Sequence, residues 1–75
     1  MQKLDKSQNI YSLVRLSPDK VRERMFEAGL SPYDLAYKAG VNIKTIYRAL
    51  GHRRIQIGTA SRIAKALGSS ILDLI

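Results

Sequence analysis

The sequence predicts an all-α domain of five short helices that contains a helix-turn-helix, with a short strand before the helices as an open alternative. Apolar residues recur at helical spacing through most of the chain, which is the pattern of helices that bury one face. Glycine or a capping serine stands at the ends of these periodic segments. The 75 residues make one domain with a small core. We divide the chain into an arm or strand (residues 1–17) and a helical domain (residues 18–75).

The segment Ile10–Leu16 is rich in residues that favour β-strands, and it ends at Ser17 and Pro18. A lone strand is not stable. The segment therefore pairs with another chain, packs flat on the helices, or is itself helical.

The first helix is expected to begin after Ser17, because serine is a good N-cap and Pro18 suits the first turn. Gly29 ends it. Its core face holds Val21, Met25 and Ala28. Its solvated face holds Arg22, Glu23, Arg24 and Glu27.

The next two helices, over Ser31–Leu50, form the helix-turn-helix. Ser31 caps the first of them, with Asp34 at the spacing of a capping box, and Gly40 ends it where the chain needs a positive φ. Asn42 caps the second helix. The buried side of the second helix holds Ile46, Ala49 and Leu50. The front of the same helix holds Ile43, Lys44, Tyr47 and Arg48.

Residues 51–58 have glycine at both ends and are expected to be a loop. At least one of Ile55 and Ile57 should enter the core. The fourth helix is predicted over residues 59–67, capped by Thr59 or Gly58. A fifth, short helix should open at Ser70, which has Asp73 at capping-box spacing.

The charge distribution points to a polyanionic partner. The formal net charge is +7 and the pI is about 10.2, which favours nucleic acid or an anionic membrane surface. No acidic residue stands between Asp34 and Asp73, a span that holds seven cations. These cations are Lys38, Lys44, Arg48, Arg53, Arg54, Arg62 and Lys65.

Other function classes have little support in the sequence. Cysteine is absent, which excludes disulfides and thiolate metal sites. His52 is the single histidine, and one histidine alone cannot make a metal site or a catalytic dyad. No nucleophile, carboxylate pair or ligand cluster suggests catalysis. We therefore predict a protein that is not an enzyme and uses no metal or cofactor. No apolar run of membrane-spanning length and no signal peptide is evident, which predicts a cytoplasmic protein.

The segments LSPYDLAYKAGVNIKTIYRAL and TASRIAKALGSSILDLI resemble the helix-turn-helix proteins of the Cro/lambda-repressor-like (XRE) family over Val21–Ile75. The resemblance implies a five-helix bundle that binds double-stranded DNA as a transcriptional regulator, most often a repressor. It also implies a homodimer in a prokaryotic or phage cytoplasm, associated with the nucleoid. Pro32 stands where such proteins often have a DNA-contacting glutamine.

The resemblance assigns two sets of DNA contacts. The residues expected at base edges are Asn42, Ile43, Lys44, Tyr47 and Arg48. Those expected at phosphates are Ser31, Tyr33, Thr45, Arg53 and Arg54. Each surface lysine or arginine taken alone is equally well explained as a solvated side chain.

Two further questions stay open in the sequence. An antitoxin that autoregulates through the same fold and binds its toxin through residues 1–17 is the alternative function, and a basic arm gripping DNA with Lys3, Lys6 and Arg15 is another use of that segment. An RNA-binding or membrane-surface module is less well supported. The dimer contact is either the Ile10–Leu16 strand or the apolar C-terminal segment. That segment holds Ile71, Leu72, Leu74 and Ile75.

Overall fold

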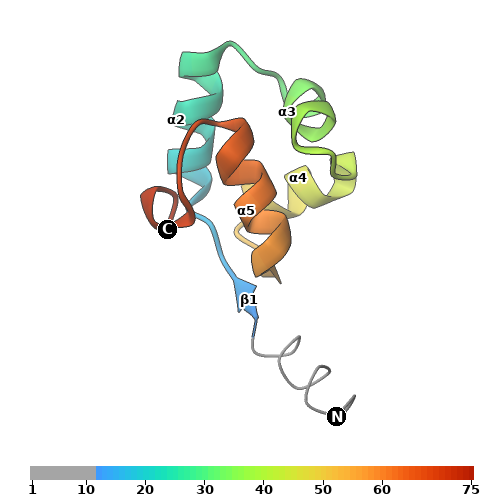
Figure 1. Ribbon diagram of the computed structural model, residues 1–75, viewed down its shortest axis with the longest axis vertical. Helices are drawn as coiled ribbons and strands as arrows, with labels where there is room; N and C mark the ends of the chain where they lie inside the picture. The colour runs from blue at the N-terminus through green and yellow to red at the C-terminus, as the bar shows by residue number, and fades with distance from the viewer. Residues whose placement is uncertain (1–11) are drawn as a thin grey trace.

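The computed structural model describes residues 12–75, so the expectations for residues 1–11, including Lys3 and Lys6, lie outside the described part. Within that part the chain forms four α-helices, one 3-10 turn and two very short strands (Figure 1). The helices are α2 (Pro18–Ala28), α3 (Pro32–Ala39), α4 (Ile43–Leu50) and α5 (Ile57–Ala66). The strands are β1 (Leu13–Val14) and β2 (Ile55–Gln56), and the 3-10 turn is η1 (Ile71–Asp73).

The core lies between the four helices, and each of them contributes apolar side chains to it. The largest fully buried side chains are Leu16, Val21, Leu35, Ile46, Ile63 and Leu74. Met25 is buried as predicted, but Ala28 is exposed. The chain reverses at Gly29, and Leu30 packs against the core in place of Ala28.

The fifth α-helix is absent from the described residues, and the single 3-10 turn η1 stands in its place. Asp73 does accept a hydrogen bond from the Ser70 amide at 3.0 Å, as the capping-box spacing predicts. The helix stops there because Leu74 turns into the core and its carbonyl accepts a hydrogen bond from the Ser17 amide at 2.6 Å. Leu72 and Ile75 remain exposed.

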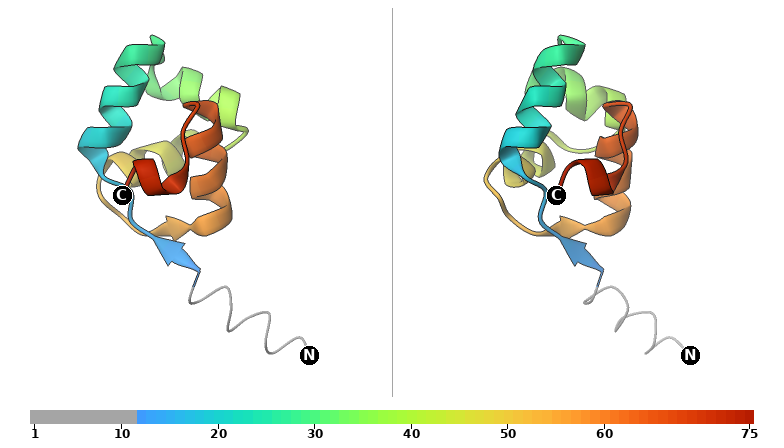
Figure 2. Two further views of the ribbon diagram at one scale, coloured as in Figure 1. Left: turned by 60° about the vertical axis from the view of Figure 1, so that its left-hand side comes forward. Right: turned by 90° about the vertical axis from the view of Figure 1, so that its left-hand side faces the viewer.

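The N-terminal strand has its partner in the same chain, and not in another chain as one of the predicted alternatives had it. β1 pairs antiparallel with β2, with Leu13 opposite Gln56 and Val14 opposite Ile55. Figure 2 shows β1 beside the short segment that leads into α5. Residues 55 and 56 are thus a strand rather than part of a loop.

Helix α5 begins two residues earlier than predicted, with Gln56 rather than Gly58 or Thr59 at the N-cap. The Gln56 side chain makes no capping hydrogen bond. Instead, the amide of Ile57 donates to the carbonyl of Ser12 at 2.7 Å, so the start of α5 is set by a segment far away in the sequence. Ile55 is buried and Ile57 is half exposed, which agrees with the expectation that at least one isoleucine enters the core.

Candidate nucleic-acid interface

The helix-turn-helix forms at the predicted residues. Ser31 and Asp34 form a capping box: the Asp34 amide donates to the Ser31 hydroxyl at 3.1 Å and the Ser31 amide donates to the Asp34 carboxylate at 3.0 Å. Gly40 ends α3 with φ of 69°. The Asn42 side-chain carbonyl accepts the Lys44 amide at 2.8 Å and caps α4. All these contacts are local, which explains why the sequence predicted them.

Helix α4 is divided as expected into a buried back and an exposed front. Ile46 and Ala49 are buried, while Lys44, Tyr47 and Arg48 are exposed. Ile43 is the residue that differs from the prediction, because it is partly buried and packs against the core. Only part of its side chain therefore remains on the front of α4.

Two tyrosines connect the start of α3 to the front of α4. The rings of Tyr33 and Tyr47 meet edge to face, with centroids 6.5 Å apart and an angle of 85° between their planes. Partial burial, followed by the charge and hydrogen bond of Tyr33, raises the pKa of Tyr47 above its usual value. The Tyr47 hydroxyl therefore stays neutral at physiological pH and can donate a hydrogen bond.

Cations border α4 on both sides of its exposed front. One hollow is lined by Lys44, Tyr47, Arg48, Gly51 and Arg53. The other hollow, which we call the strand-side hollow, is lined by Leu13, Thr45, Arg48, Arg54, Ile55, Gln56 and Thr59. Arg48 borders both. Within residues 12–75, no hydrogen bond or ion pair engages the side chains of Lys44, Arg48, Arg53 or Arg54. These four charges are free to meet an anion.

The predicted site residues thus separate into two groups. Tyr33, Lys44, Tyr47, Arg48 and Arg53 lie at or beside the exposed front of α4. Thr45 and Arg54 lie in the strand-side hollow with Arg48. Ser31 and Asn42 already use one side-chain oxygen each for capping.

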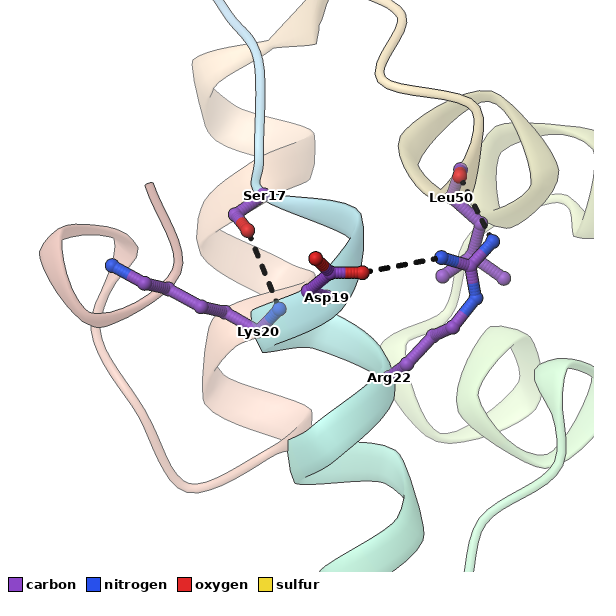
Figure 3. A network of polar contacts seen from close by, with 5 residues as sticks. All are labelled: Ser17, Asp19, Lys20, Arg22 and Leu50. Carbon is purple, nitrogen blue, oxygen red and sulfur yellow. Dashed lines mark hydrogen bonds and ion pairs between the residues drawn. The ribbon is translucent and has the colours of Figure 1, made fainter.

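Arg22 lies on the exposed face of α2, as predicted, but it also makes a contact that the sequence did not indicate. Its guanidinium donates to the carbonyl of Leu50, the last residue of α4, at 3.2 Å, and lies 3.9 Å from the carboxylate of Asp19 (Figure 3). Arg24 was also assigned to the solvated face, yet it donates to the Ser69 hydroxyl. The hydrogen bonds of Arg22 to Leu50 and of Arg24 to Ser69 join residues 28 and 45 positions apart, so no local pattern could have revealed them.

The chain turns sharply after α4. Gly51 has an ordinary negative φ, whereas His52 takes the left-handed conformation with φ of 60°. The Arg53 amide then donates back to the Arg48 carbonyl at 2.9 Å. This turn carries the chain from the end of α4 to Arg53 and Arg54.

Three cations of the acid-free span lie elsewhere. Lys38, Arg62 and Lys65 line a third hollow, together with Ala39 and Ala66 of α3 and α5. Lys38 and Lys65 stand in the last turns of their helices, where a cation interacts favourably with the helix dipole. The acid-free span therefore serves more than one surface.

A family model described as the Cro/C1-type HTH DNA-binding domain matches residues 20–75. The chain belongs to this family. The resemblance to Cro/lambda-repressor-like proteins is thereby confirmed. A solved structure of a mutant hydroxyethylphosphonate dioxygenase is also similar, with a TM-score of 0.72 and 24% identity over 83% of this chain and 14% of that one. The match shows the fold alone. No curated protein matches the chain.

The Cro/C1-type match begins within α2, so β1 lies outside it. In the described part of this Cro/C1-type protein, no three His, Asp or Glu side chains are grouped so that they could hold a metal ion. Over the same residues, no helix has the length and apolar character needed to cross a membrane.

Proposed function

We propose that this protein is a sequence-specific regulator of transcription, most simply a repressor, that reads double-stranded DNA by placing α4 in the major groove. The observation that carries the proposal is the exposed front of α4, where Lys44, Tyr47 and Arg48 project between two cationic hollows. An α-helix fits the major groove of B-DNA. The second helix of a helix-turn-helix lies in that groove, with its outer face toward the base edges.

Base contacts follow from the groups left free on α4. Lys44 and Arg48 are donors suited to O6 and N7 of guanine. The carbonyl oxygen of Asn42 is used in capping, so its NH₂ group is the one available to a base acceptor. The exposed part of Ile43 suits a thymine methyl group, and Tyr47 can donate from its neutral hydroxyl.

Phosphate contacts would flank the groove on both sides. Ser31 and Tyr33 stand at the start of α3, where backbone amides and the helix dipole favour an anion. Thr45 and Arg54 of the strand-side hollow, and Arg53 of the turn, would contact phosphates on the other side. These contacts would position the protein and supply affinity without reading sequence.

A two-fold dimer would let two copies of α4 read half-sites about 34 Å apart. The C-terminal segment is the better dimer contact of the two considered. Leu72 and Ile75 are exposed there, with 78% and 47% of their surfaces accessible. The strand segment already has a partner within its own chain.

The experiment selects DNA sites from a random pool with the wild type and then measures binding by Lys44→Ala and Arg48→Ala. Each variant should lose about 1–3 kcal/mol on the selected site and show relaxed base preference at one position. Lys38→Ala and Lys65→Ala are matched controls, because they remove the same charge from the third hollow. Equal losses in all four variants, without a change in base preference, would contradict reading by α4.

The second candidate function is an antitoxin. It is favoured by the segment Ser12–Val14, which lies outside the family match and beside the proposed DNA interface. In that case a partner protein would bind the N-terminal part of the chain, and the same fold would repress the pair of genes. Co-expression with the product of the adjacent gene distinguishes the two. A stable complex that is lost when residues 1–11 are deleted supports the antitoxin.

A further inference from the structure

We propose that β1 is a positioning element for DNA binding: by pairing with β2 it holds Arg54 in the strand-side hollow, so that DNA binding and the β1–β2 pairing stabilise each other. This inference rests on the proposed DNA-binding function and adds a residue set that the family match does not contain. The match covers residues 20–75, and β1 ends at Val14.

The pairing supports the segment just before α5 through its backbone. In an antiparallel ladder, hydrogen-bonded and non-hydrogen-bonded residue pairs alternate. The Ile57 amide donates to the Ser12 carbonyl at 2.7 Å, which marks that pair as hydrogen-bonded. The register then makes Leu13 and Gln56 a non-hydrogen-bonded pair and Val14 and Ile55 a hydrogen-bonded one.

The segment from Arg53 to Ile57 has few local supports of its own. It follows a left-handed histidine, and the helix that it leads into has no capping side chain. The side chain of Ile55 is buried and anchors one side of the segment. β1 supplies the backbone partner on the open edge of β2. Without it, the first amide of α5 would lose its acceptor and β2 would be a lone strand.

β1 and the residues of the proposed DNA interface line the same strand-side hollow. It is lined by Leu13 of β1, Arg48 of α4, Thr59 of α5, and Arg54. Arg54 immediately precedes β2, so its backbone position follows from that of Ile55 and Gln56. A phosphate held by Arg54 would therefore favour the paired state. The coupling is reciprocal: the factor by which DNA binding favours the paired state is also the factor by which DNA affinity falls when Ser12–Val14 separates from β2.

The test is a double-mutant cycle between Val14→Pro and Arg54→Ala in the full chain, read by the slope of log K against log salt. Proline at position 14 removes the amide that the ladder uses. Val14→Ala is the matched control, because it keeps that amide while shortening the side chain. With valine or alanine at 14, Arg54→Ala should reduce the slope by roughly one. With proline at 14, Arg54→Ala should leave the slope unchanged.

Equal effects of Arg54→Ala in all three backgrounds would overturn the proposal, because Arg54 would then contact DNA whether or not β1 is paired. Far-UV circular dichroism at the assay temperature checks that the proline variant is folded. If it is not, Leu13→Cys combined with Gln56→Cys replaces it. The chain has no other cysteine, and a non-hydrogen-bonded antiparallel pair brings its Cα atoms to about 4.5 Å, within disulfide range.

In that variant, oxidation should tighten DNA binding relative to the reduced protein, and Arg54→Ala should abolish the difference. A difference that survives Arg54→Ala, or no difference at all, would contradict the proposal. A wild type that binds no duplex DNA would overturn the proposed function itself. That result is distinct from a wild type that binds DNA while Arg54 acts independently of β1.

Discussion

The two connections on either side of α4 are built in different ways. The turn before it, from Gly40 to Asn42, contains a glycine at φ of 69° and an asparagine that caps the helix. The connection after it, from Gly51 to Gln56, contains a histidine at φ of 60° and ends at a helix without a capping side chain. The first is stabilised by residues within a few positions of it. The second depends on Arg22 and on β1.

This difference shows how the front of α4 is held in place. The local turn sets the angle between α3 and α4, so it fixes the motif itself. The second connection sets where Arg53 and Arg54 lie, and its supports come from segments that close only when the whole domain has folded. Substitutions in the first connection should therefore change the free energy of unfolding of the domain strongly. Substitutions in the second connection should change it less.

The largest effect is expected for Gly40→Val, which places a β-branched residue at positive φ. It should lower the free energy of unfolding by roughly 1–3 kcal/mol. A Cβ atom at this position would meet no heavy atom within 4 Å, so the cost comes from the backbone conformation and not from a clash. Thermal melting without DNA measures it. Gly58→Ala is the control, since that glycine has neither a positive φ nor a close neighbour, and it should not destabilise the protein.

Arg22→Ala tests whether a distant side chain supports the end of α4. The carbonyl of Leu50 would lose its charged donor, and the free energy of unfolding should fall by about 1 kcal/mol. Chemical denaturation gives the value. Glu23→Ala is the neighbouring control on the exposed surface of α2. Equal stability of the two variants would show that the Arg22 contact adds nothing.

His52→Gly relieves the left-handed conformation of the second connection. The gain in the folded state is partly offset by the greater freedom of glycine in the unfolded chain, so the net stabilisation should be about 0.5 kcal/mol. The same change at Asn42, whose φ is −69°, should instead bring no such gain. A melting temperature that falls in the His52 variant would show that the imidazole has a stabilising contact that outweighs the strain.

The smallest effect concerns pH and the capping box of α3. Hydrogen bonds from the Ser31 amide and hydroxyl hold the pKa of Asp34 below its usual value. A carboxyl group with a lowered folded-state pKa stabilises the fold above its unfolded pKa of about 3.9, and this contribution is lost as the pH falls through the folded pKa. Asp34→Asn should therefore flatten the loss of stability below about pH 4. If stability falls with decreasing pH equally in the wild type and the variant, the Asp34 carboxyl does not contribute to the pH dependence of stability.

Much of this molecule was determined by the sequence alone. The caps at Ser17, Ser31 and Asn42, the glycine ends of α2 and α3, and the division of α4 into two faces all arise within one or two helical turns. Such features depend on the conformational preferences of single residues and on helical spacing. The Cro/C1-type helix-turn-helix and the exposed cations of α4 could therefore be predicted.

Only the tertiary structure decided the rest. Residues that lie 28 or more positions apart are joined by the pairing of β1 with β2, by the early start of α5, and by the hydrogen bonds of Arg22 to Leu50 and of Arg24 to Ser69. Ile43 is partly buried and Ala28 is exposed, each contrary to prediction, because the burial of a residue depends on which neighbouring segment packs against it. A local pattern shows that a helix has an apolar face or that a residue carries a charge. Which distant residue packs against that face or bonds to that charge is decided only when the whole domain folds.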